Sequence, residues 1–180
     1  FMTTGEKIKY FRNMRGISQD TLGQLSGINS ATIKKYEYGI RNPKPDQLLK
    51  IANALGISIN IFMDFDIETV SDVLSLLFKL DDQIDMKFEA DKDDEGNFKP
   101  ATVKLSFKNN LINKKLCTYM KALEIRKNML KAKDDYSEEE YADSLQHINE
   151  NIEEIKQHLL DDNMVVKKDT DRLTVKNYPN

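Results

Sequence analysis

The stretch SQDTLGQLSGINSATIKKYEYG, residues 18–39, has the apolar spacing of helices but contains two glycines, Gly23 and Gly27. Two helices joined by a turn of three or four residues cross closely only where the first helix carries a very small side chain. Gly23 meets this requirement, and Gly27 can adopt the positive φ that the turn needs without steric cost. The stretch therefore predicts a helix-turn-helix. We expect Gly23→Leu to force its two helices apart and Gly23→Ala to be nearly harmless.

Residues that favour helix caps flank both predicted helices. Ser18 is expected to cap the first helix, which ends near Ser26. The second helix is expected to begin at a cap, Asn29 or Ser30, and to end near Tyr38. Ser26 occupies a core position, where we expect its hydroxyl to bond to its own helix. The apolar anchors expected between the two helices are Leu22, Ile28, Ile33 and Tyr36.

Three further short helices are expected around this pair, near residues 4–14, 45–55 and 59–65. Ser58 is the expected cap of the last one, and the middle one is expected to bury Leu48, Leu49, Ala52 and Leu55. Six of the seven glycines lie within the first 56 residues, as tight turns between short helices require. Residues 1–64 carry nine Lys and Arg against five Asp and Glu, and the remainder carries eighteen against twenty-five. The sequence thus predicts a basic head followed by an acidic body.

The segment RGISQDTLGQLSGINSATIKKYEYGIRNPKPDQLLKIANALGIS resembles the helix-turn-helix domain of the lambda-repressor and Cro-like (xenobiotic-response-element, or XRE, type) transcriptional regulators. The resemblance covers about residues 3–65. It implies a mainly α fold, with a five-helix head that places its third helix in the major groove of DNA. It also implies a structural ion pair between Arg12 and Glu37. The function it implies is that of a sequence-specific DNA-binding regulator of transcription. Because a single small head reads only a few base pairs, we expect a repressor that acts as a dimer on a palindromic operator.

The resemblance also indicates which residues touch DNA. It places the family's phosphate-contacting glutamine at Gln19 and its base-reading positions at Ser30, Ala31 and Lys35. Their chemistry agrees, because a lysine can donate to guanine O6 and N7 and an alanine methyl can contact a thymine methyl. Further candidates flank the base-reading residues or are placed to contact phosphates. They are Asn29, Lys34, Tyr38, Arg41 and Lys44. The alternative for the basic residues is an ordinary solvated face.

The rest of the chain predicts an α+β module. Residues 66–82 are expected to form a linker helix with an apolar stripe of Ile67, Val70, Val73, Leu74, Leu77 and Leu80. Residues 83–162 are expected to form a dimerisation and possible sensor module of a β-hairpin and two helices. The hairpin is expected around the loop DKDDEGNFKP, with apolar positions at Ile84, Met86 and Phe88 and at Val103, Leu105 and Phe107. A hairpin alone is marginal in water, so its apolar face should lie on helices or on a second subunit.

Two long helices are expected to complete this module, near residues 111–133 and 137–160. In the second, Tyr141, Leu145, Ile148, Ile152, Ile155 and Leu159 repeat with 4-3-4-3-4 spacing. This spacing is typical of a coiled-coil seam, and we expect the module to form a homodimer. Residues 163–180 are expected to be a polar tail, in which RLTVKNY could add a short strand.

Several functions are excluded by the composition. No apolar run approaches the roughly 20 residues of a membrane span, so we expect no membrane partner. The single cysteine, Cys117, cannot form an intramolecular disulfide, and it is expected to be a buried, inert thiol in a cytoplasmic protein. His147 and His158 lack the companions of a metal site, and DKDDEG lacks the twelve-residue calcium pattern. We expect no cofactor, no metal and no enzymatic activity.

Three questions stay open at this point. The module of about one hundred residues could bind an effector, which could be a small molecule, a peptide or a protein. The chain could instead be an antitoxin-like protein, whose acidic body neutralises a partner while the head regulates its own gene. It could also be an enzyme with an accessory DNA-binding head, which a pocket lined by carboxylates or histidines would indicate.

Overall fold

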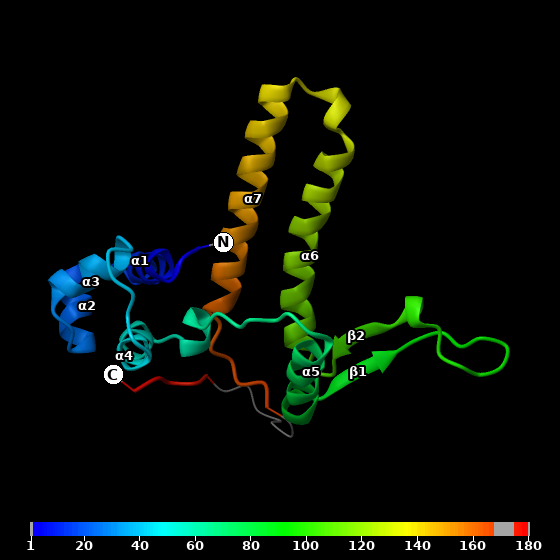
Figure 1. The fold of residues 1–180 in the computed structure, drawn as a ribbon, viewed down its shortest axis with the longest axis horizontal. Coiled ribbons are helices and arrows are strands. Elements are labelled where there is room, and N and C mark those ends of the chain that lie inside the picture. The colour runs from blue at the N-terminus through cyan, green and yellow to red at the C-terminus, as the bar shows by residue number, and fades with distance from the viewer. Residues whose placement is uncertain (1, 168–174, 180) are drawn as a thin grey trace. The chain divides into compact units, whose positions relative to one another are not determined.

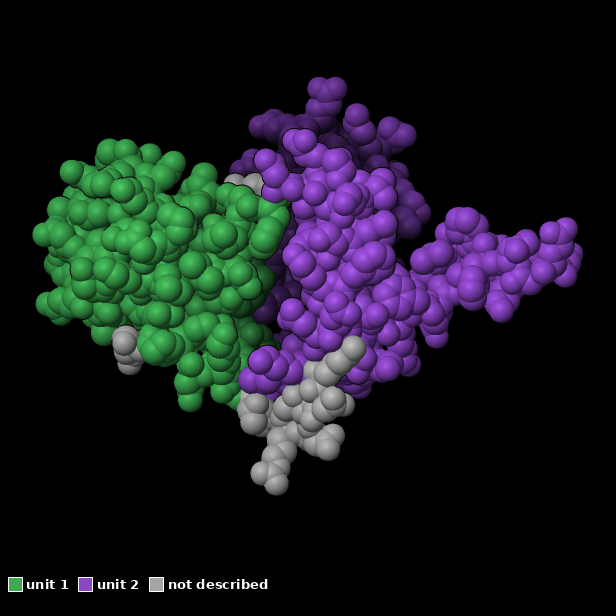
Figure 2. All heavy atoms as spheres, turned by 60° about the horizontal axis from the view of Figure 1, so that its bottom comes forward, with its two compact units in different colours: residues 1–65, 160–163, 175–180 green, residues 66–159, 164–174 purple. Residues whose placement is uncertain are grey.

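The computed structural model describes residues 2–167 and 175–179 (Figure 1). The chain forms two compact units, which Figure 2 shows in different colours. The head comprises Phe1–Phe65 together with Leu160–Asn163 and Val175–Asn180. The body comprises Asp66–Leu159 and Met164–Thr174. The strand expected in RLTVKNY falls largely outside the described residues.

The head is built from short helices. They are α1 (Thr4–Met14), α2 (Gln19–Ser26), α3 (Ser30–Glu37), α4 (Pro45–Leu55) and the 3₁₀ helix η1 (Ile59–Phe62). Ser18 accepts a hydrogen bond from the amide of Thr21 and so caps α2, while Asn29 accepts one from Ala31 and so caps α3. The expected α-helix over 59–65 is wrong in type and length. Met63 is already extended, with φ −82° and ψ 124°, so the last element ends after one turn.

A single apolar cluster fills the head and contains every anchor expected from the sequence. It comprises Ile8, Phe11, Leu22, Ile28, Ile33, Tyr36, Leu48, Ile51, Ala52, Leu55, Ile57, Ile61 and Phe62. The expectation for α4 is wrong at one position, because Ile51 is fully buried and Leu49 is exposed. The inner face of α4 is thus centred on Leu48, Ile51 and Leu55, which recur every three or four residues as one face of a helix requires.

The described part of the body contains three longer helices, a two-stranded hairpin and two short 3₁₀ helices. In chain order they are α5 (Val70–Ile84), β1 (Met86–Glu89), η2 (Pro100–Thr102), β2 (Lys104–Phe107), α6 (Asn110–Lys131), η3 (Lys133–Asp135) and α7 (Glu138–Leu160). The strands are antiparallel, and Phe88 pairs with Leu105. The mainly α fold with a small hairpin is therefore confirmed.

The linker helix begins and ends later than expected. Thr69 and Asp72 form a capping box, which fixes the start of α5 after residue 69. At the other end, Ile84 belongs to the helix rather than to the strand. Asp85 follows it with φ 60°, the one non-glycine residue with positive φ in the described chain, and turns the backbone into β1.

The helices α6 and α7 run antiparallel in the body (Figure 1). The Lys156 ammonium of α7 lies 5.9 Å from the Tyr119 ring of α6. All six seam residues of α7 are buried or half-buried, with Ile152 the most buried. The seam is therefore covered at least partly within one chain.

Cys117 is exposed, so the expectation of a buried thiol is wrong. The buried line of α6 runs through Ala122 and Met129. Ala122 lies five positions after Cys117, which places the two residues about 140° apart around the helix. Separately, no helix in residues 2–167 and 175–179 has both the length and the apolar character that crossing a bilayer requires.

Candidate nucleic-acid interface

The helix-turn-helix has the close crossing that the sequence predicts. Gly27 ends α2 in the left-handed conformation, with φ 66° and ψ 27°. A Cβ atom placed on Gly23 would lie 2.7 Å from the backbone oxygen of Ile28 and 3.2 Å from the amide nitrogen of Ser30. The expectation that Gly23→Ala is nearly harmless is therefore wrong, since backbone atoms already occupy the space that a methyl group would need.

A second close approach was not visible in the sequence. A Cβ atom on Gly5, in the first turn of α1, would overlap the backbone oxygen of Tyr36 near the end of α3. The N-terminus of α1 thus packs directly against α3. Glycine in the first turn of a helix has no sequence pattern that distinguishes such an approach from an ordinary helix start.

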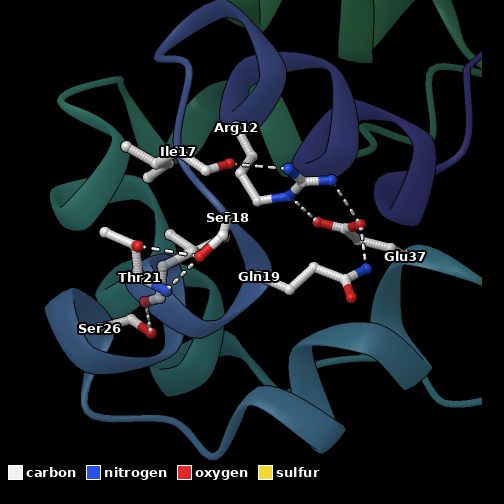
Figure 3. Close-up of polar contacts among 8 residues, drawn as sticks. Arg12, Ile17, Ser18, Gln19, Thr21, Ser26 and Glu37 are labelled. Atoms are coloured by element: carbon white, nitrogen blue, oxygen red, sulfur yellow. Dashed lines mark hydrogen bonds and ion pairs between the residues drawn. The ribbon is translucent and has the colours of Figure 1, made fainter.

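Three polar side chains connect α1, α2 and α3 beneath the expected DNA-binding surface (Figure 3). Arg12 Nε donates to Glu37 Oε1 at 2.6 Å, and a second guanidinium nitrogen lies 3.1 Å from Glu37 Oε2. Gln19 Nε2 donates to the same Oε2 at 2.7 Å. The Glu37 side chain is 1% exposed, and its hydrogen bonds with Arg12 raise the pKa of that guanidinium. The expected Arg12–Glu37 pair is confirmed, and it also orients Gln19.

Other polar atoms in this region are satisfied locally. Arg12 Nη1 donates to the backbone oxygen of Ile17 at 2.8 Å (Figure 3). The Ser26 hydroxyl donates to the backbone oxygen of Leu22 at 2.6 Å, as expected for a buried serine in this helix. The first contact ties α1 to the segment just before α2, and the second lies within α2.

The residues predicted to contact DNA are accessible on the head. Gln19 and Ser30 are half-buried, and the exposed members of the set are Asn29, Ala31, Lys34, Lys35, Tyr38, Arg41 and Lys44. Along α3, Ala31 and Lys35 are four positions apart and therefore share one face. The structure adds Lys9, whose ammonium lies 6.0 Å from the Tyr38 ring. Sequence reasoning missed Lys9, because it lies on α1, far from the motif.

The chain after α7 returns to the head and forms a polar clasp. Arg15 donates to both carboxylate oxygens of Asp161, at 2.6 and 3.1 Å, and its Nε donates to the backbone oxygen of Leu55 at 2.9 Å. Asn163 Nδ2 donates to the backbone oxygen of Gly56 at 2.8 Å. The clasp thus joins the ends of α1 and α4 to Asp161 and Asn163. No local pattern could have indicated it, since Arg15 and Asp161 are 146 positions apart.

The structure offers no candidate metal centre in its described part. Among residues 2–167 and 175–179, no three His, Cys, Asp or Glu side chains are grouped so that they could hold an ion. His147 bonds through Nδ1 to the backbone oxygen of Asp143 at 3.0 Å, and this contact raises the pKa of its ring. Its nearest polar partners therefore belong to its own helix.

Residues 8–62 match the family model HTH_3, which describes a helix-turn-helix. An uncharacterized HTH-type transcriptional regulator of Sinorhizobium medicae is 33% identical over 60 residues, which are 33% of this chain and 43% of the relative. The SPbeta prophage-derived regulator YonR of Bacillus subtilis, also an uncharacterized HTH-type regulator, is 31% identical over 71 residues, 37% of this chain and 66% of the relative. The chain thus spans less than two thirds of either relative.

Two solved structures are also similar to the head. The restriction-modification controller protein C.AhdI from Aeromonas hydrophila is 33% identical, with a TM-score of 0.33, over 33% of this chain and 91% of that one. The P22 c2 repressor, solved in complex with a synthetic operator, is 27% identical, with a TM-score of 0.34, over 37% of this chain and 100% of that one.

Proposed function

We propose that the chain is a sequence-specific DNA-binding regulator of transcription, a repressor that acts as a dimer on a palindromic operator. One observation carries the proposal. The segment that matches the helix-turn-helix family folds into α2, the Gly27 turn and α3, with accessible polar residues along α3. The regulators similar to this segment favour the same role. The second helix of such a motif is the one that enters the major groove.

Base recognition is assigned to the first turns of α3. Ser30 is the first residue of the helix, and Lys35 lies one turn further along, next to the exposed Lys34. The Lys35 ammonium can donate to guanine O6 and N7, and the Ala31 methyl can contact a thymine methyl. The side-chain oxygen of Asn29 already accepts a hydrogen bond from the amide of Ala31 in the helix cap. Its side-chain amide hydrogens are therefore the groups that can reach DNA.

Phosphate contacts are assigned to residues around the ends of α2 and α3. The amide of Gln19 has two hydrogens, and Glu37 accepts one of them. The second hydrogen can donate to a phosphate oxygen while the ion pair holds the side chain in place. Arg41, Lys44 and Tyr38 are exposed beyond the end of α3 and can position the helix without reading bases.

The dimer is proposed because one head contacts only a short stretch of DNA. A single small helix-turn-helix reads only a few base pairs, whereas two heads related by a two-fold axis read a palindrome. Linking the two binding events makes the second effectively intramolecular and so raises both affinity and specificity. The body favours this arrangement, because it exposes apolar side chains along α5 and the hairpin.

The test is a titration of the full chain against its operator, chosen from selected oligonucleotides, and against a scrambled duplex at several salt concentrations. Lys35→Ala should weaken operator binding by about 1–3 kcal/mol and affect the scrambled duplex much less. Arg41→Ala should weaken binding to both duplexes alike. It should also reduce the slope of log affinity against log salt concentration by about one. Lys50→Ala, which removes an exposed lysine from α4, is the matched control and should change neither.

Two results would contradict the proposal. If no oligonucleotide is enriched above the scrambled sequence, the chain does not read DNA specifically. If Lys35→Ala weakens binding to both duplexes equally, α3 does not read bases through Lys35.

A further inference from the structure

The hairpin of the body forms an arm with an uncovered apolar side. The arm comprises residues 86–107, and it projects from the rest of the body at the right of Figure 2. Met86 at its base is buried, whereas Phe88 is 50% exposed and Phe98 is 65% exposed. Phe88 pairs with Leu105, which is also exposed. Since a two-stranded hairpin is marginal in water, this side of the arm requires a cover.

The tip of the arm is held in one conformation by its own hydrogen bonds. Asp93 Oδ1 accepts from the amides of Glu95 and Asn97, at 3.0 and 2.8 Å. Asp91 accepts from the amide of Lys99 at 2.8 Å through its backbone oxygen. The Lys92 ammonium lies 4.8 Å from the Phe98 ring. A tip ordered in this way loses little conformational entropy on binding, which suits a recognition element.

The tip is acidic. It exposes four carboxylates against two lysines, namely Asp91, Asp93, Asp94 and Glu95 against Lys92 and Lys99. An acidic tip next to an exposed aromatic ring fits a surface that offers apolar side chains rimmed by basic ones.

Such a surface lies on α6 of the same body. A groove of about 630 Å³ runs along this helix, with Cys117, Met120 and Leu123 among the residues that line it. Three lysines rim the groove, Lys121, Lys127 and Lys131, with a single carboxylate, Glu124, between them. The described residues that line it all belong to α6.

The groove follows α6 from Cys117 to Lys131, a rise of about 21 Å at 1.5 Å per residue. Covering the exposed parts of the Phe88 and Phe98 rings would remove roughly 170–290 Å² of apolar surface from water for each arm.

We propose that two copies of the chain pair by exchanging arms, so that the hairpin arm of each copy lies in the α6 groove of the other. The inference rests on the dimer of the proposed function and names its contact surface. Two complementary patches on one chain form a closed pair when a two-fold axis relates the copies, because each arm then meets a groove. The acidic tip faces the lysines of the partner, and the phenylalanines of the arm lie on Met120 and Leu123.

The single cysteine makes a direct test possible. The unmodified chain carries an exposed thiol in the groove at Cys117. A second chain carries Cys117→Ser and Asp94→Cys, which moves the thiol to the tip of the arm. After subunit exchange between the two full-length chains, a short bismaleimide should join them covalently. A control chain with Cys117→Ser and Glu139→Cys has its thiol at the exposed start of α7 and should lose this product.

A charge exchange provides an independent measurement. Asp94→Lys with Glu95→Lys should raise the dissociation constant of the dimer about tenfold or more, because like charges then face each other. Adding Lys121→Glu and Lys127→Glu should return the dissociation constant to that of the unmodified chain. Sedimentation of each variant gives the dissociation constant.

The outcomes separate this inference from the proposed function. If sedimentation shows a dimer but the Asp94→Cys chain gives no more product than the Glu139→Cys chain, the arm exchange is wrong and the dimer stands on another surface. A chain that stays monomeric overturns both the exchange and the dimer, while the DNA titration of the head still tests sequence reading. A charge reversal that leaves the dissociation constant unchanged also overturns the exchange.

Discussion

The head and the body cover their apolar residues to very different extents. In the head, one cluster buries side chains from every helix, and the buried polar residues Ser26 and Glu37 are hydrogen-bonded. In the body, none of the fifteen residues of α5 is buried by the described part of the chain, and Val70 and Phe78 are exposed. Gln157 is buried there, yet its Oε1 has no hydrogen-bond partner among the described residues. A monomeric surface with so much apolar exposure indicates an interaction site.

The difference teaches that the two parts obtain stability from different sources. The head is stabilised by apolar contacts among its own residues, so its surface residues are available for binding. The body has long helices but little interior, and the proposed dimer would remove part of its remaining apolar surface from water. The substitutions below test this contrast in order of expected effect.

Matched leucine substitutions should give the largest contrast. Leu22 is fully buried in the head, and Leu74 on α5 is 40% exposed. Leu22→Ala should lower the free energy of unfolding by about 2–5 kcal/mol, because it leaves a cavity. Leu74→Ala should lower it by roughly 1 kcal/mol or less at high dilution. Denaturant unfolding measures both, and equal losses would show that the body has a core of its own.

Gly23→Ala should have the next largest effect. The added methyl group would meet the backbone oxygen of Ile28, so the two helices must separate, which destabilises the head by about 1–3 kcal/mol. Gln24→Ala, one position along on the exposed side of α2, is the control and should be nearly neutral. Thermal melts compare them. A Gly23→Ala chain as stable as the parent would mean that α2 and α3 do not cross as described.

The clasp should contribute less. Asp161→Asn removes the charge that Arg15 pairs with, and because both side chains are partly exposed we expect a loss of about 1 kcal/mol or less. The loss should shrink at high salt, since exposed charges are screened. Glu139→Gln removes an exposed carboxylate from the first turn of α7 and is the control. Denaturant unfolding at low and high salt tests this, and a salt-independent loss would contradict the ion pair.

The smallest effect concerns the tip of the arm and pH. Hydrogen bonds from the amide of Asn97, its side chain and the amide of Glu95 hold the pKa of Asp93 below its ordinary value. A lowered pKa means that these bonds stabilise the tip above the ordinary pKa of about 3.9 and are lost as the pH falls through the lowered value. The amide resonance of Asn97 should report that transition in an NMR titration. Asp93→Asn should abolish it, and an unchanged curve would contradict the contact.

The head could be predicted closely because its signals are local. Ser18 and Asn29 each cap a helix by bonding to an amide at most three residues further along the chain. Gly27 forms the turn through its own positive φ alone. The apolar anchors follow from helical spacing. The Arg12–Glu37 pair followed from the resemblance, but the role of Glu37 in holding Gln19 did not.

Contacts between distant segments could not be predicted. Whether a methyl group fits at Gly5 or Gly23 depends on where another helix passes, to within a few tenths of an ångström. The Arg15–Asp161 pair joins residues from opposite ends of the chain. In the body, the spacing of the α7 seam correctly indicated an apolar stripe. Spacing alone does not say whether that stripe is covered by the same chain or by another.

Sedimentation of the full chain beside the fragment of residues 1–65 tests the contrast between head and body most directly. The account predicts that the full chain is a dimer that dissociates on dilution, and that the fragment is a folded monomer, because its core lies within it. A full chain that stays monomeric at every concentration, or a fragment that dimerises as tightly as the full chain, would contradict it.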